Sequence, residues 1–271
     1  MANPAFHRGM RTLGIGFGQK ERALGHAAAC RAVLGTADGV DHAAAVGRHR
    51  RFVREVLAEL SGHRHPLAPL DPPGDELRPR DPGPVLYVSV HRGNWIVGAR
   101  ALGNPDRPIH TVAGTQLHRA VSPWLVRWLQ RRGVVVHPGA GAHRALARTL
   151  RAGGRVLLHL DGDPFGGGSR TRGVGHDVLP RRNLPAGVRS AALLAARHGV
   201  RVEGVLCERD LGGTFQVRKT ELTVPADVSS TRVHVASTHW EARLMRYLVD
   251  TVREDPERWL LFRDEHLAGG A

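Results

Sequence analysis

From residue 85 onward, short apolar stretches alternate with longer amphipathic ones, and this alternation limits the folds open to the chain. Most of the apolar stretches are dominated by Val, Leu and Ile, which favours β-strands. Strands interleaved with helices are typical of an α/β sheet covered by helices. We therefore predict a single α/β domain with a mixed β-sheet and helices on both faces. The expected strands are Val85–Val90, Ile109–Ala113, Val134–His137, Val156–Leu160, Val202–Cys207 and Phe215–Arg218.

The segments between these strands carry helix start and stop signals. A serine followed by proline begins the first helix, and a glycine follows the end of each one. The last helix is expected to begin near Thr238, because Thr238 and Glu241 have the spacing of a capping box. The other expected helices are Ser122–Arg132, His143–Ala152 and Pro185–His198.

The region before the first strand divides into two parts. The first seventy residues are predicted to be helical, with apolar residues at helical spacing from Phe52 to Leu60. A connector over residues 65–84 contains seven prolines and would end that helical region. We expect residues 1–84 to form a helical N-terminal cap and connector, and residues 85–271 to form the α/β core, within one structural domain.

The formal net charge of +14 comes almost entirely from arginine. Such a surface is either solvated or recruits polyanions, such as phospholipid headgroups, CoA, an acidic carrier protein or nucleic acid. Aromatic residues make up only 5%, and no nucleic-acid-binding fold is recognisable, which argues against nucleic acid. Two cysteines give no disulfide framework, and no apolar run is long enough to span a membrane. We expect a cytoplasmic protein, able to contact an anionic membrane peripherally.

The motif SVHRGNWIVG, residues 89–98, follows the first expected strand. His91 comes directly after an apolar run, and Gly93 allows a sharp turn. A histidine at the exit of a strand can reach a substrate and act as a general base. An ordinary loop histidine fits the same pattern, since the chain has 17 histidines.

The motif resembles that of the lysophospholipid-type acyltransferases. His91-Arg92-Gly93-Asn94-Trp95 is similar to the H-x-G-N-W start of their H-x4-[D/E] motif, and the nearest branch is the bacterial lipid A and phosphatidylinositol-mannoside acyltransferases. The resemblance spans roughly residues 45–266 and implies a glycerolipid acyltransferase-like fold. Four more segments resemble the family in the right order: SPWLVRWLQRRGVVV, LRAGGRVLLHLDGDPFG, LPAGVRSAALLAARHGVRVEGVL and VREDPERWLLFRDEH.

This resemblance implies transfer of an acyl group from a thioester, acyl-CoA or acyl-carrier protein, to a hydroxyl or amine of a lipid, glycolipid or small molecule. In the family the histidine deprotonates the acceptor, and an acid five residues later orients the imidazole. The resemblance also implies that Gly93 and Asn94 shape the turn and donate hydrogen bonds, and that Trp95 walls the pocket. No cofactor is expected.

The sequence departs from the family at the orienting acid, because Ile96 stands five residues after His91. Three interpretations follow. Asp161 or Asp163, which leave the end of a neighbouring strand, replaces the acid; the acceptor is an amine that needs little base help; or the scaffold has lost catalysis and binds an acyl carrier or lipid. The stretch Asp161-Gly162-Asp163 also resembles the D-x-D motif of metal-dependent glycosyltransferases.

Several arginines are candidate substrate-binding residues, although surface solvation explains them equally well. The resemblance loosely places arginines that hold the acceptor or oxyanion near Arg119, Arg131 and Arg132. Arg170 and Arg172 lie in a glycine- and arginine-rich loop that could bind phosphates. The histidines do not lie at zinc spacing from cysteines or carboxylates in the sequence, so no metal site is expected.

Overall fold

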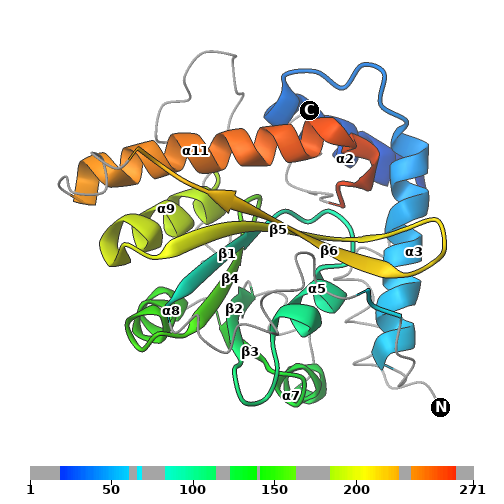
Figure 1. Ribbon diagram of the computed structural model, residues 1–271. Helices are drawn as coiled ribbons and strands as arrows, with labels where there is room; N and C mark the ends of the chain where they lie inside the picture. Colours follow the sequence, from blue (N-terminus) through cyan, green and yellow to red (C-terminus); the bar gives the residue numbers. More distant parts are fainter. Residues whose placement is uncertain are drawn as a thin grey trace.

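The computed structural model describes residues 19–60, 66–68, 83–113, 123–138, 141–162, 184–225 and 233–260. Its centre is a six-stranded sheet of order β3-β2-β4-β1-β5-β6 (Figure 1). The first five strands pair in parallel, and β6 runs antiparallel to β5, so the predicted mixed α/β sheet is confirmed. The strands are β1 (Val85–Ser89), β2 (Ile109–Ala113), β3 (Val134–Pro138), β4 (Arg155–His159), β5 (Arg201–Arg209) and β6 (Phe215–Leu222).

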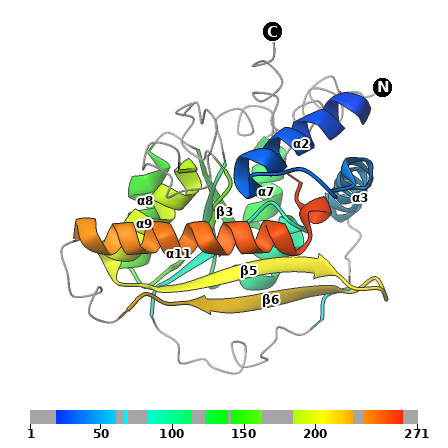
Figure 2. The same cartoon turned by 90° about the horizontal axis from the view of Figure 1, so that it is seen from above.

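Helices cover both faces of this sheet (Figures 1 and 2). One apolar cluster joins the sheet to α2 (Gln19–Leu34), α8 (Ala142–Arg151), α9 (Ala186–His198) and α11 (Val233–Glu254). The other joins it to α3 (His42–Leu60), α5 (Trp95–Leu102) and α7 (Pro123–Gln130). All five residues of β1 are buried, because alternate side chains enter opposite clusters. The N-terminal helix α3 therefore packs into the same core as the sheet.

Two helices differ from the sequence prediction. Helix α11 begins at Val233, and the Thr238 hydroxyl donates to the His234 carbonyl oxygen 3.0 Å away inside the helix, so the predicted capping box is wrong. Helix α5 was not predicted. It begins directly after the motif, where the Asn94 side chain accepts a hydrogen bond of 3.2 Å from the Val97 backbone N–H.

The register of the parallel strands places His91 and Asp161 at the same edge of the sheet. Strand β1 pairs with β4 so that Ser89 lies opposite His159. His91 and Asp161 each follow two residues later, at the carboxyl-terminal edge of the sheet, which is where open α/β sheets bind ligands. A short 3-10 helix, η2 (Pro256–Arg258), brings the chain back to this edge after α11. Among the described helices, none combines the length and the apolar character needed to cross a bilayer.

Candidate active site

His91 and Asp161 form a hydrogen-bonded pair. His91 Nδ1 lies 2.8 Å from Asp161 Oδ1. The His91 side chain is 30% exposed, whereas that of Asp161 is 1% exposed, so a buried carboxylate holds a ring that is partly open to solvent. Because Nδ1 is engaged, Nε2 is the ring nitrogen left to accept a proton.

The second oxygen of Asp161 is held as firmly as the first. Oδ2 accepts one hydrogen bond of 3.0 Å from the His91 backbone N–H and another of 2.7 Å from the Trp259 indole N–H. Burial alone would raise the pKa of Asp161, but the His91 ring and these hydrogen bonds outweigh it and hold the pKa below its usual range. The carboxylate therefore stays ionised. With both oxygens occupied, it is poorly suited to ligate the metal ion of a D-x-D glycosyltransferase.

The segment after η2 locks the motif in place. The Leu260 backbone N–H donates to the His91 carbonyl oxygen at 2.6 Å, and Trp259 pairs with Arg92 in a short antiparallel bridge. The Arg92 side chain is buried, and its partners lie on β5 and α11. Its guanidinium donates to Glu208 at 2.7 Å, to Glu254 at 3.0 Å and to the Thr251 carbonyl oxygen at 2.6 Å. Arg92 thus anchors the turn that carries His91.

Gly93 and Asn94 make that turn possible. Gly93 has a φ of 71°, and a Cβ there would collide with the Cys207 carbonyl oxygen. The Asn94 backbone N–H donates to that same oxygen at 2.8 Å, and its side-chain amide donates to Glu55 at 3.2 Å. Asn94 is buried, and its donors hold the turn, as its cap holds α5.

One aromatic ring stacks on His91, and a second packs against that ring. His159 stacks on it with ring centroids 4.3 Å apart, and Trp95 meets His159 edge-on at 5.5 Å. Protein surrounds most of the His159 ring, and this burial, reinforced by His91, lowers its pKa to about 3. His159 is consequently neutral at neutral pH. Its buried Nε2 meets no hydrogen-bond partner among the described residues.

A cavity of about 350 Å³ lies against the turn after His91. Its wall carries charges of both signs. Arg48 pairs with Asp255 and Glu257, both at 2.9 Å, and Arg209 lies 3.4 Å from Glu55. The lining residues are Arg48, Arg51, Phe52, Glu55, Gly93, Asn94, Glu208, Arg209, Phe215, Arg258 and Leu260.

Not every predicted site residue lies near His91. Arg131 and Arg132 precede β3, at the amino-terminal edge of the parallel strands and thus opposite the imidazole. Arg132 instead stacks over the Trp128 ring, 3.9 Å from its centroid. This corrects the expectation that the two arginines bind substrate beside His91, because they lie across the length of the strands from it. Asp163, Arg119, Arg170 and Arg172 lie outside the described residues.

Ile96 is a core residue, although it stands at the position where the resembled family has its acid. It is 4% exposed and packs in the apolar cluster between α5 and the sheet. A carboxylate at position 96 would enter that cluster, and the carboxylate that contacts His91 instead follows β4. Of the three interpretations left open by the sequence, this geometry favours replacement by Asp161.

Trp259 and His159 were missed as site residues by the sequence analysis. Trp259 lies in the C-terminal segment that carries the family resemblance, which was a usable signal. No comparable signal marks His159. Compared with known proteins, the chain matches no family model and no curated sequence.

Proposed function

We propose that the protein is an acyltransferase that moves an acyl group from a thioester donor to a hydroxyl or amine, with His91 as the general base. The observation that carries this proposal is the 2.8 Å contact between the partly exposed His91 ring and the buried Asp161 carboxylate. A positioned imidazole with a buried, ionised partner is the arrangement that activates hydroxyl nucleophiles in acyl transfer.

In the proposed reaction, the acceptor approaches Nε2 of His91. The ring takes its proton while the acceptor oxygen or nitrogen attacks the thioester carbonyl carbon. Asp161 keeps the proton on Nδ1 and stabilises the imidazolium that forms. Collapse of the tetrahedral intermediate breaks the carbon–sulfur bond, and the imidazolium returns its proton to the leaving thiolate. Atoms and charges balance without a cofactor.

The basic character of the protein supports an anionic donor. The chain carries a net charge of +14, and four arginines line the cavity beside the motif. Acyl-CoA and the phosphopantetheine arm of an acyl-carrier protein both present phosphates, which arginine binds well. The same chemistry suits a membrane lipid or a small molecule as the acceptor. A lipid acceptor would be reached from the cytoplasmic side of an anionic membrane.

The test is thiol release from a panel of acyl-CoA and acyl-carrier-protein donors, each offered lysophospholipid, glycolipid and small amine acceptors. We expect His91→Ala to lower turnover by about 10²- to 10⁴-fold, the usual contribution of a general base. His239→Ala is the matched control, because His239 is an exposed histidine on α11. It should keep the wild-type rate.

Two results would overturn the proposal. One is an unchanged rate in His91→Ala, which would remove the imidazole from the chemistry. The other is donor binding by the wild-type protein without thiol release for any donor and acceptor pair, which would identify a scaffold that holds an acyl carrier or lipid.

A further inference from the structure

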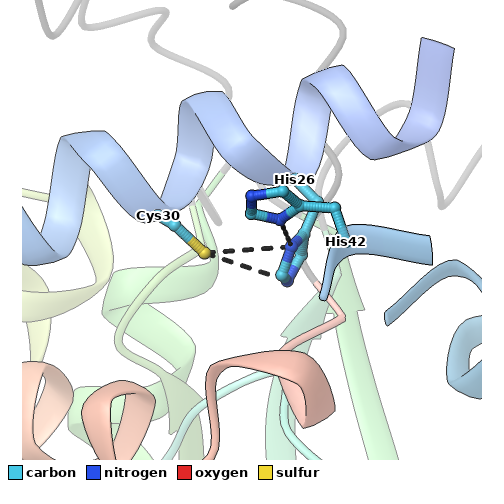
Figure 3. A group of neighbouring side chains, drawn as sticks. All are labelled: His26, Cys30 and His42. Carbon is cyan, nitrogen blue, oxygen red and sulfur yellow. Dashed lines mark hydrogen bonds between the residues drawn. The ribbon is translucent and has the colours of Figure 1, made fainter. Parts of the chain in front are cut away.

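A second histidine cluster lies on the other side of Trp259. His26 and Cys30 lie four residues apart on α2, which places both side chains on one helix face. His42, the first residue of α3, faces them across the gap between the two helices (Figure 3). His26 Nδ1 lies 2.8 Å from His42 Nδ1 and 3.8 Å from Cys30 Sγ. In the part of the chain that the structure describes, no other group of three such side chains has metal-binding spacing.

Two backbone carbonyl groups fix the orientation of the His26 ring. Its Nε2 lies 3.0 Å from the Pro256 carbonyl oxygen and 3.1 Å from the Trp259 carbonyl oxygen, so Nε2 carries the proton and donates to both. The lone pair of Nδ1 therefore points toward His42, whereas Cys30 Sγ lies beside the ring, 3.8 Å from Nδ1 and 4.0 Å from Nε2. Histidines that bind metals are held in this way, with the second ring nitrogen donating to a backbone carbonyl or a carboxylate.

We propose that His26, Cys30 and His42 bind a divalent transition metal, and that zinc is the ion their donor atoms select. Two imidazole nitrogens and one thiolate form a borderline-soft set that suits zinc and disfavours magnesium and calcium. Water takes the fourth position. The site lies outside the proposed acyl-transfer chemistry and does not depend on it.

The three ligand atoms lie within 4.8 Å of one another, and a tetrahedral ion would require the Cys30 side chain and the histidine rings to turn toward it. With zinc–nitrogen and zinc–sulfur bonds of ordinary length, two ligand nitrogens lie about 3.3 Å apart and a nitrogen–sulfur pair about 3.6 Å apart. The observed separations are 2.8 Å for His26 and His42 and 3.8 Å for His26 and Cys30. Half an ångström of movement is enough, roughly, to open the histidine pair. His42 is only partly buried at the end of its helix, so its ring can make that movement.

Metal binding would change the protonation of two of the three ligands. Without the ion, the His42 Nδ1–H donates to His26 Nδ1. When zinc binds, the His42 proton moves to Nε2, and the Cys30 thiol releases its proton to solvent because the thiolate is the ligand. No oxidation state changes. Metal uptake must therefore release about one proton per site.

The site would brace three separate elements. His26 and Cys30 come from α2, His42 from α3, and the Trp259 carbonyl that holds His26 follows η2. Trp259 is fully buried, and its indole N–H donates to Asp161 on the opposite side. An ion here would fix the packing of the N-terminal helices against the segment that holds the buried carboxylate.

The experiment uses the full chain after removal of any polyhistidine tag. The protein is stripped with a chelator and titrated with Co²⁺, a spectroscopic substitute for zinc, and zinc affinity is then measured by competition. We expect one Co²⁺ per chain with a thiolate-to-cobalt charge-transfer band and the d–d bands of four-coordinate cobalt. Cys30→Ala should abolish the charge-transfer band. It should also weaken zinc binding by more than the roughly 10- to 100-fold that loss of an outer-shell partner costs.

Two further variants complete the design. Cys207→Ala is the matched control, since Cys207 is the other buried cysteine and lies on β5; it should keep both the band and the affinity. His42→Ala truncates a partly buried ring, so it tests the site even where Cys30→Ala folds poorly. It should retain the thiolate band with weakened binding. The proposal is overturned by cobalt binding without a thiolate band, by no stoichiometric binding, or by equal affinity in wild type, Cys30→Ala and His42→Ala.

Discussion

Trp259 lies between two histidine clusters, and the imidazole rings of the two clusters have different hydrogen-bond partners. On one side its indole N–H donates to Asp161, which holds His91; on the other its carbonyl oxygen accepts from His26. His91 is partly exposed and hydrogen-bonded to a carboxylate, whereas His26 is fully buried and hydrogen-bonded to backbone carbonyls.

A carboxylate partner stabilises an imidazolium, because a full negative charge faces the new positive charge. A carbonyl partner fixes the tautomer but offers only a dipole. For His26, burial is the largest effect and lowers the pKa to about 4, so the ring stays neutral and keeps a lone pair. The hydrogen-bond partner and the exposure of each histidine are therefore what suit it to its proposed role, proton transfer for His91 and metal binding for His26.

The largest effect is expected from removing the negative charge of Asp161. In Asp161→Asn, the one remaining oxygen can still accept from the His91 backbone and the Trp259 indole. The new amide N–H₂ then faces His91 Nδ1 and forces the proton onto Nε2. The ring is held in the wrong tautomer, and turnover should fall by about 10³- to 10⁴-fold. The measurement is thiol release at saturating donor.

Circular dichroism and thermal unfolding should show that Asp161→Asn keeps its fold, because the number of hydrogen bonds is preserved. A folded variant with more than a tenth of wild-type turnover, roughly, would mean that the carboxylate only positions the chain and does not set the tautomer of His91.

The second prediction concerns the pH dependence of stability. His159 has a pKa of about 3 in the folded protein, below its ordinary value of 6.5. The unfolded chain therefore binds more protons between these two values, and the free energy of unfolding falls as the pH is lowered through that window. His159→Phe keeps a ring against His91 but removes the titration. It should lose about 2 kcal/mol less than wild type between about pH 6 and pH 4.

Urea unfolding at several pH values measures this difference. Some slope should remain in His159→Phe, because burial also lowers the pKa of His26, His110, His137, His143 and His198. Identical slopes for wild type and variant would mean that the His159 ring is protonated in the folded state.

Much of the architecture could be predicted from the sequence, because fully buried parallel strands leave continuous apolar runs. All six strands were located, and β2 was predicted with its observed bounds. The start of α11 was missed because Thr238 and Glu241 have capping spacing inside a longer helix. Helix α5 was missed because the first half of it lies within the stretch that was taken as the motif, residues 89–98.

The candidate site was only partly predictable, because the contact between its residues depends on the register of two paired strands. His91 and Asp161 were both singled out, but their contact depends on Ser89 lying opposite His159 in the parallel pair, and single-sequence patterns do not fix that pairing. Trp259 and the cluster of His26, Cys30 and His42 depend on contacts between distant segments. The separation of His26 and Cys30 is readable on a helix face, but the approach of His42 follows from the packing of α2 on α3.

The smallest expected effect tests the residue that joins the two clusters. Trp259→Phe keeps the backbone carbonyl and the ring but removes the indole donor, so Asp161 Oδ2 loses one of its two hydrogen bonds. The free energy of unfolding should fall by about 1–3 kcal/mol, and kcat by about fivefold, with KM for the donor unchanged. Cobalt affinity should not change, because His26 contacts the carbonyl of residue 259, which phenylalanine also supplies. A variant that lost metal affinity together with turnover would show that the clusters are coupled through the indole and do not act as independent sites. Unchanged turnover with weakened metal binding would mean that the indole supports the metal cluster and not Asp161.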